Sequence, residues 1–191
     1  MHGIIFSELR KYVEARSGGN GWSTLLEKAG LGGKLYMSVG EYPDSEVVAL
    51  VTAASVMTGY SVAATLEDFG EFITPSLMGM YGHLIKPNWR ALDVIENTEG
   101  TIHSVVRVQN PGAKPPKLRT ARLSPEEVIL IYDSPRQLCG LAKGIGKGLA
   151  KHFKETLLIS ETRCMHKGAS SCEIHFRNAR CAKYAYFETT I

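Results

Sequence analysis

The stretch Tyr132-Asp133-Ser134-Pro135-Arg136 ends an apolar pattern that starts at Val128 and predicts a β-strand. Side chains alternate between the two faces of a strand, so we expect Tyr132, Ser134 and Arg136 to point to one face. That face presents a phenol, a hydroxyl and a planar guanidinium. Because arginine can donate two parallel hydrogen bonds to a carboxylate, the pattern favours a ligand that carries carboxylates.

His103 lies upstream in a helical pattern, among the apolar residues Ile102, Val105 and Val106. A lone histidine on an apolar helix face is most often a core residue. A neutral imidazole in such surroundings is also a suitable axial ligand for a metal in a buried pocket. The residues by themselves leave both interpretations open.

Four features occur in one order along the chain: the opening Met1-His2-Gly3-Ile4-Ile5-Phe6, the segment Ile102-His103-Ser104-Val105-Val106-Arg107, the loop Pro111-Gly112-Ala113-Lys114-Pro115-Pro116, and the Tyr-x-Ser-x-Arg motif. Together they resemble the haem nitric oxide/oxygen binding family, known as H-NOX. The resemblance covers roughly residues 1–177.

The resemblance implies a cofactor and roles for several residues. The cofactor is haem b, and His103 is its proximal iron ligand. Tyr132, Ser134 and Arg136 match the residues that bind the haem propionates, and Pro116 matches a proline that presses on the porphyrin. In this family nitric oxide binding at ferrous iron weakens or breaks the iron–histidine bond.

Apolar periodicity predicts a helical N-terminal half. The expected helices lie at about 3–16, around 22–29, from Asp44 as N-cap to Gly59, from Ser61 to Met80 with a kink at Pro75, from Asn88 to Val106 with Gly100 loosening it, and from Gln137 to Phe153.

Strands are expected at 117–123, 128–132, 156–160 and 173–176, which makes the fold class α+β. We expect a helical N-terminal subdomain packed on a haem-binding subdomain that contains an antiparallel sheet and inserted helices. The expected domain is 1–177, divided at about residue 60, and 178–191 is a C-terminal tail.

The composition is that of an ordinary globular chain, with 44% hydrophobic and 21% charged residues and a net charge of +3. No dense Lys/Arg stripe occurs, so nucleic acid is not expected as a partner. The longest apolar stretch, Val47–Met57, is too short to span a bilayer, and no signal peptide is evident. We expect a cytoplasmic protein without membrane contact.

The distal side of the haem is expected to be apolar. Family members that hold oxygen place a tyrosine in the helix after the arginine, and the matching position here is Leu141. Ile5 and Leu149 are further candidates for this wall, together with Leu9 and Ile73. Bound oxygen gains from a hydrogen-bond donor, whereas nitric oxide needs far less help. We therefore expect nitric oxide and carbon monoxide as ligands.

Cys139, Cys164 and Cys172 are candidate zinc ligands, because three thiolates at one point favour that metal. The segment around Cys164 and Cys172 resembles the zinc-bearing bacterial subgroup of the family, in which the fourth ligand is a histidine three residues before the second cysteine. Here that position is Glu161, so either Glu161 or His166 is expected to complete the site. Cys181 is a weaker candidate. Free thiols are the alternative.

We expect a gas sensor that is not an enzyme, since no nucleophile with a paired base and no phosphate loop occurs. The expected output is through a separate signalling protein, by resemblance a histidine kinase or a cyclic-dinucleotide enzyme. The alternatives are a zinc/thiol redox sensor on the same fold and, ranked last, a haem enzyme, which needs a polar distal acid or base.

Overall fold

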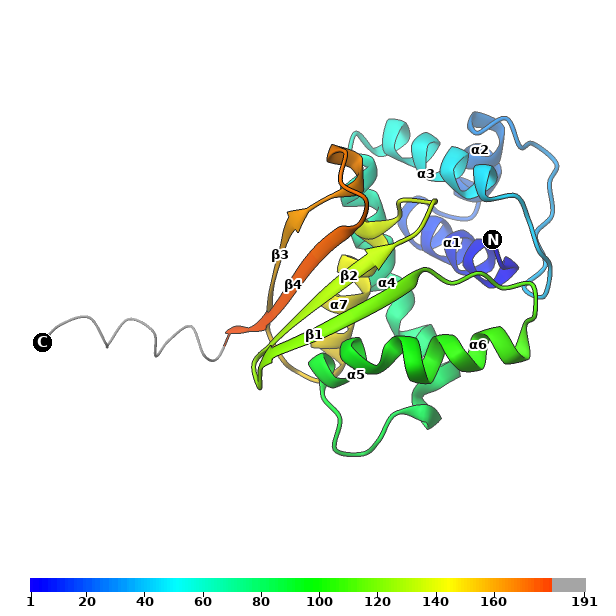
Figure 1. The fold of residues 1–191 in the computed structure, drawn as a ribbon. Coiled ribbons are helices and arrows are strands. Elements are labelled where there is room, and N and C mark those ends of the chain that lie inside the picture. The colour runs from blue at the N-terminus through cyan, green and yellow to red at the C-terminus, as the bar shows by residue number, and fades with distance from the viewer. Residues whose placement is uncertain (180–191) are drawn as a thin grey trace, which may run out of the picture.

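The computed structural model describes residues 1–179 of the chain. Most of the expected tail and Cys181 lie outside the described residues. Four helices form the N-terminal half: α1 (Gly3–Ser17), α2 (Gly21–Lys28), α3 (Asp44–Thr58) and α4 (Val62–Tyr81). They lie on one side of the molecule, with α4 running on towards the sheet (Figure 1).

Local side-chain caps mark the starts of α1 and α4, whereas α2 and α3 have none. The Ser61 hydroxyl accepts the Ala64 N–H at 3.1 Å at the start of α4. The predicted cap at Asp44 is wrong: Pro43 holds the N-cap position, and the Asp44 carboxylate instead pairs with the N-terminal amine and Arg136. Helix α4 continues through Pro75 as one uninterrupted helix.

The helix that carries His103 consists of three consecutive pieces, α5 (Ala91–Thr98), the π-helical turn η2 (Glu99–His103) and α6 (Ser104–Gln109). A short 3-10 turn, η1 (Gly82–Leu84), precedes it. The predicted start at Asn88 is wrong, because Asp93 accepts the Arg90 N–H and the helix begins at Ala91. The backbone does depart from α geometry at Gly100, where loosening was predicted.

The four strands form one antiparallel sheet with the order β1-β2-β4-β3. Their bounds are β1 (Lys117–Ser124), β2 (Glu127–Asp133), β3 (Leu157–Arg163) and β4 (Cys172–Asn178). A 3-10 turn, η3 (Met165–Lys167), lies between β3 and β4. The inward positions of β2 and β4 are buried and apolar, which is the alternation expected when one sheet face packs on a core.

Helix α7 (Cys139–His152) packs closely against α4, and glycines permit the approach. A Cβ on Gly70 would lie 2.4 Å from the Leu141 carbonyl oxygen, and one on Gly144 would lie 2.1 Å from the Glu67 carbonyl oxygen. Both helices lie behind the sheet in Figure 1. The Gly-rich segment of α7 therefore serves helix packing.

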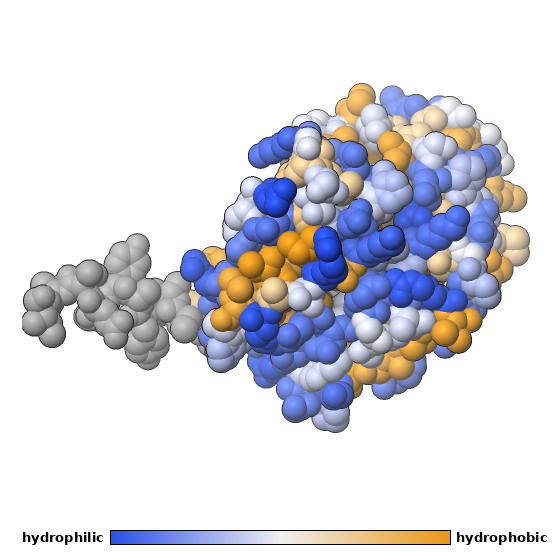
Figure 2. Space-filling view, in the orientation of Figure 1, coloured by the Kyte–Doolittle hydropathy of each residue, from blue (hydrophilic) through white to orange (hydrophobic). Residues whose placement is uncertain are grey.

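Two hydrophobic clusters make up the core. The first joins α1, α2 and α3 with the first half of α4, and the second joins α5, the sheet and α7. Ile145 contacts both clusters. Hydrophilic residues cover much of the surface, around an apolar area over the strands (Figure 2). The mixed helical and antiparallel-sheet architecture confirms the predicted fold class.

In the described part of the chain, no single helix has both the length and the apolar character needed to cross a bilayer. One pair, α3 followed by α4 with η1, passes that test only when taken together, and it is bent by 105°.

Candidate functional site

A cavity of about 480 Å³ lies where the two hydrophobic clusters meet. Its walls come from α1, α4, the α5–η2–α6 helix, the Pro-rich loop, the sheet and α7. The residues that line it include Ile5, Thr74, Leu77, Met78, Ile95, Ile102, His103, Val106, Pro116, Leu118, Tyr132, Arg136, Leu141, Ile145 and Leu149. The lining is mainly apolar, with a few polar side chains at defined places.

His103 is the last residue of the π turn and its side chain is 15% exposed. Its Nδ1 atom lies 2.9 Å from Glu99 Oε2. Burial lowers the pKa of His103, against the opposing effect of the Glu99 carboxylate, which favours the neutral form of the ring. Because Nδ1 is engaged, Nε2 is the ring nitrogen that remains for a metal.

Arg136 lines the same cavity and its side chain is 10% exposed. Its Nε atom lies 2.9 Å from Asp44 Oδ2, and Nη1 donates to the Lys114 carbonyl oxygen at 2.6 Å. The N-terminal amine of Met1 lies 2.8 Å from Asp44 Oδ1. The guanidinium is therefore held in place from both α3 and the Pro-rich loop.

The prediction that Tyr132, Ser134 and Arg136 share a strand face is wrong, because β2 ends at Asp133. The Ser134 hydroxyl accepts the Arg136 N–H at 3.3 Å, a local turn that competes with the strand. Ser134 is buried and is not among the cavity residues. Tyr132 and Arg136 do line the cavity, and the Tyr132 phenol oxygen accepts the Leu138 N–H at 3.2 Å.

Of the expected apolar wall, Ile5, Leu141 and Leu149 line the cavity. Leu9 and Ile73 do not; they are buried in the first hydrophobic cluster. Pro116 lines the cavity as expected.

Sequence reasoning missed several residues of the site, such as Met78 and Leu118. Two of those missed, Ile145 and Glu99, could have been found. Ile145 follows Leu141 by four positions and so lies on the same helix face, and Glu99 precedes His103 by the same interval. The spacing of four positions was visible in the sequence and would have identified both.

The residues present fit a haem group. Apolar walls suit the porphyrin, a neutral imidazole on one wall suits the iron, and a guanidinium held at Arg136 suits the propionates. The fit is one of donor chemistry: His103 offers a nitrogen ligand and Arg136 a cation in a largely apolar cavity, whose other basic or imidazole side chains are His2 and Lys114.

A second group of side chains gathers beside α7, where Cys139, Cys164 and Cys172 place their sulfur atoms near one another. The Sγ–Sγ distances are 4.0 Å from Cys139 to Cys164 and 4.0 Å from Cys172 to Cys164. All three cysteines are buried. Burial raises the pKa of the Cys139 and Cys172 thiols, and the neighbouring Cys164 acts in the same direction on both. A tetrahedral zinc–thiolate site has sulfur atoms about 3.8 Å apart, so this spacing fits zinc.

Glu161 belongs to this group: its carboxylate and the three sulfur atoms all lie within 4.8 Å of one another. Its Oε1 atom is buried without a hydrogen-bond partner among the described residues, and Oε2 lies 3.5 Å from Lys143 Nζ. His166 is exposed, and its Nε2 lies 2.7 Å from the Gln137 carbonyl oxygen, outside the group. The structure thus brings Glu161 to the thiols and not His166.

The comparisons with known proteins agree with this geometry. The chain resembles the H-NOX protein from Shewanella oneidensis solved in the Fe(II)NO ligation state, with 28% identity, a TM-score of 0.86, and coverage of 93% of this chain and 99% of that chain. The H-NOX protein from K. algicida has the same fold at 22% identity, with a TM-score of 0.82 and coverage of 93% and 96%. No curated protein sequence matches the chain.

A family model described as "Haem-NO-binding" matches residues 2–161. The match includes α1, the helix that carries His103, β1, β2 and α7, which are the elements that build the cavity. The chain therefore belongs to the haem-NO-binding, or H-NOX, family.

Proposed function

We propose that the protein is a haem b sensor of nitric oxide and carbon monoxide. His103 holds the iron through Nε2, and Arg136 binds the propionates, with Tyr132 and Ser134 supporting the loop that carries it. When bound, the haem supplies a ferrous iron that takes up a diatomic gas. The observation that carries the proposal is the largely buried His103 ring, which contacts Glu99 at Nδ1 and lines a mainly apolar cavity.

The choice of gas rests on the wall formed by Ile5, Leu141, Ile145 and Leu149. None of these side chains offers a hydrogen-bond donor, which bound oxygen needs far more than nitric oxide does. This favours nitric oxide and carbon monoxide over oxygen. The S. oneidensis neighbour is described in Fe(II)NO and Fe(II)CO states, which supports the same choice.

We further propose that the domain spans 1–177, with a division at about residue 60, and that it is a cytoplasmic protein without catalytic activity of its own. It passes its signal to a separate protein, such as a histidine kinase or a cyclic-dinucleotide enzyme. Exposed apolar side chains are a feature of protein-contact surfaces. Here they include Leu35, Met37, Val39 and Val108.

An absorption spectrum of the ferrous protein, recorded with and without nitric oxide, tests the proposal. We expect a haem Soret band that shifts on addition of nitric oxide. Purified protein, reconstituted with haem, that gives no such band would refute haem binding. A band that responds to oxygen as strongly as to nitric oxide would refute the choice of gas.

A second candidate function is a zinc/thiol redox sensor, and the group of Cys139, Cys164, Cys172 and Glu161 favours it. The buried Glu161 Oε1, which has no hydrogen-bond partner within residues 1–179, and the 4.0 Å sulfur spacing support a cation at this point. Lys143 offsets part of the negative charge of three thiolates and a carboxylate. Thiol oxidation would then release the metal.

Metal analysis of protein purified without added zinc tests this second function, and we expect about one zinc per chain. Glu161→Gln should lower zinc affinity about 10-fold or more, whereas the matched His166→Gln should leave it unchanged. Loss of zinc in His166→Gln alone would assign the fourth ligand to His166, and no zinc in the unaltered protein would remove the proposal.

A further inference from the structure

Glu99 contacts His103 from four residues earlier in the chain, and both of its carboxylate oxygens have partners. Oε2 lies 2.9 Å from His103 Nδ1 and accepts the Leu118 backbone N–H at 3.2 Å, while Oε1 pairs with the Arg107 guanidinium. An ionised carboxylate can only accept hydrogen bonds. The Glu99 contact therefore favours the ring proton on Nδ1 and makes Nε2 the nitrogen available to a metal, while the Pro116 carbonyl oxygen is a second acceptor beside the ring.

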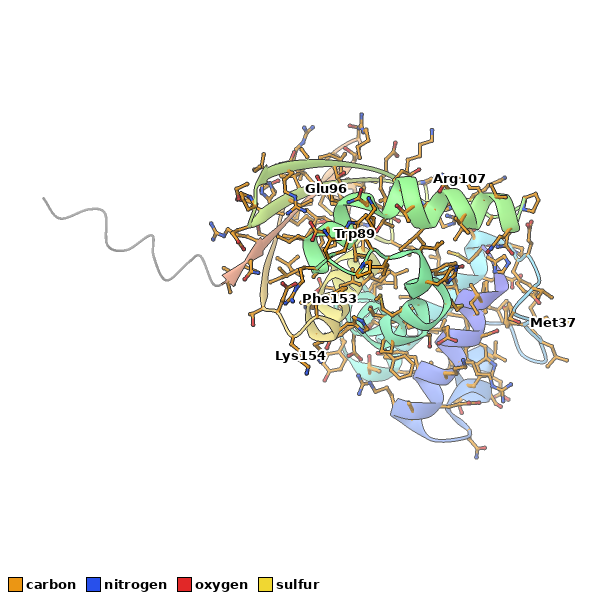
Figure 3. All side chains as sticks on the ribbon, turned by 90° about the horizontal axis from the view of Figure 1, so that it is seen from below. Met37, Trp89, Glu96, Arg107, Phe153 and Lys154 are labelled. Carbon is orange, nitrogen blue, oxygen red and sulfur yellow. The ribbon has the colours of Figure 1, made fainter. Side chains whose placement is uncertain are left out.

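The π turn brings these groups together. Glu99 is the first residue of η2 and His103 is the last, so their side chains share one face of the helix. Single π turns inside α-helices are rare and are frequent at functional sites. Figure 3 shows Arg107 on α6 and Glu96 on α5, on either side of this turn. The carboxylate thus joins η2, α6 and the start of β1.

A carboxylate that accepts the second ring N–H of a ligating histidine has two physical effects. It fixes the tautomer and the orientation of the ring, and it makes the metal-binding nitrogen a stronger electron donor. The ion pair with Arg107 acts in the opposite direction, because it draws part of the carboxylate charge away from the imidazole.

We propose that Glu99 is a positioning residue that holds His103 in the Nδ1–H form and strengthens its bond to the iron, and that Arg107 limits this strengthening. The inference rests on the proposed haem function. Two partners of one carboxylate would therefore set, in opposite directions, the strength of the bond between His103 and a bound iron.

The first test uses the haem-free protein and 15N NMR of the His103 ring. We expect the Nδ1–H tautomer in the unaltered protein and a shift towards the Nε2–H tautomer in Glu99→Leu. The matched control is Glu96→Leu, one turn earlier on α5, where the carboxylate pairs with Arg122 at 2.8 Å and not with a histidine. An unchanged tautomer in Glu99→Leu overturns the positioning role, whether or not the protein binds haem.

The second test uses the ferrous haem protein and resonance Raman spectroscopy. We expect the iron–histidine stretching band to move to lower frequency in Glu99→Leu, by less in Glu99→Gln, and to higher frequency in Arg107→Gln. Haem dissociation from Glu99→Leu should be about 10-fold faster. Glu99 has a side chain that is 32% exposed, so these variants are expected to fold.

An iron–histidine band that stays at the same frequency in Glu99→Leu and Arg107→Gln overturns the strengthening role. A shift of equal size in Glu96→Leu overturns it too, because the effect would then follow from any lost charge on this helix. Absence of haem from the unaltered protein refutes the proposed function instead, and the tautomer measurement still decides the role of Glu99.

Discussion

The two walls of the cavity differ in how much polar chemistry they carry. The wall formed by η2 and α6, here called the polar wall, carries His103. The ring contacts Glu99, and Glu99 in turn binds Arg107 and the backbone N–H of Leu118. The opposite wall, here called the apolar wall, is formed by α1 and α7 and consists of Ile5, Leu141, Ile145 and Leu149. One wall is a hydrogen-bonded network and the other is apolar packing.

Under the function proposed above, this difference would let one cavity both hold a metal and select a gas. The His103 imidazole would bind the iron from the polar wall. The side chains Ile5, Leu141, Ile145 and Leu149 of the apolar wall offer no hydrogen-bond donor, which would favour a gas that binds iron strongly without such help. The first two predictions below alter one wall each, and the later two test sites outside the walls.

The largest effect is expected for His103→Ala, which removes the nitrogen ligand from the polar wall. Haem affinity should fall by more than the roughly 100-fold that the loss of a supporting partner can cost. Haem titration followed by absorption measures it. The matched control, His152→Ala, changes an exposed histidine at the end of α7 and should leave the titration unaltered. An unchanged Soret band in His103→Ala would contradict the assignment of the polar wall.

The next effect is expected for Leu141→Tyr, which adds a donor to the apolar wall. One hydrogen bond of about 1–1.5 kcal/mol should raise oxygen affinity by roughly 10-fold. Oxygen titration of the ferrous protein measures this change, with Leu141→Phe as the control of similar shape and no hydroxyl. If the tyrosine variant binds oxygen no better than the phenylalanine variant, Leu141 does not face the bound gas.

A third prediction concerns the packing behind the apolar wall. In Gly144→Ala the new Cβ would meet the Glu67 carbonyl oxygen at 2.1 Å, which should destabilise the protein by about 1–3 kcal/mol and lower the melting temperature by several degrees. The control is Gly79→Ala on α4, where a Cβ meets nothing within 4 Å and stability should stay equal or rise slightly. Equal melting temperatures for the two variants would show that α7 can move away from α4 without a loss of free energy of unfolding.

The smallest effect is expected away from both walls, at His175 on β4. Its Nδ1 lies 3.1 Å from Glu127 Oε1, and this hydrogen bond, with a second from Glu173, raises the pKa of His175 above its ordinary value of 6.5. A raised pKa in the folded state stabilises the protein fully below pH 6.5, and the gain is lost as pH rises through the folded-state value.

Unfolding at several pH values, compared between the unaltered protein and His175→Gln, measures this contribution. Because both side chains are partly exposed and solvent screens the pair, we expect a difference below about 1 kcal/mol that is largest under mildly acidic conditions. A difference that grows towards alkaline pH has the wrong sign and would contradict the ion pair. The spectrum of bound haem should be the same in both proteins, since His175 is not among the cavity residues.

The sequence predicted most elements because their signals are local. Apolar periodicity identified α1, α3, α4 and α7, and the order of helices and strands indicated an α+β fold. The errors lie at element ends. The Asp44 carboxylate pairs with Arg136, which is distant in the chain, instead of capping its helix. Asn88 is not the cap of α5, because Arg90 holds the N-cap position. Such competition is not visible in local periodicity.

The candidate site was predicted in part. His103, Tyr132, Arg136, Pro116 and Leu141 line one cavity, as the resemblance implied. Ser134 does not, since its hydroxyl closes a turn that ends the strand before the expected alternation reaches it. The choice between Glu161 and His166 at the thiols also needed the structure, because only the pairing of β3 with β4 decides which of them faces the sulfur atoms.

The sequence by itself determined which chemical groups are available: one histidine in an apolar helix, one arginine after a strand, three thiols and an apolar helix face. Tertiary structure alone decided their partners, because residues as far apart as Asp44 and Arg136, or Glu99 and Leu118, meet only when separate elements pack. The identity of a side chain is a local property, whereas its orientation and electron-donating strength depend on the neighbours that folding supplies.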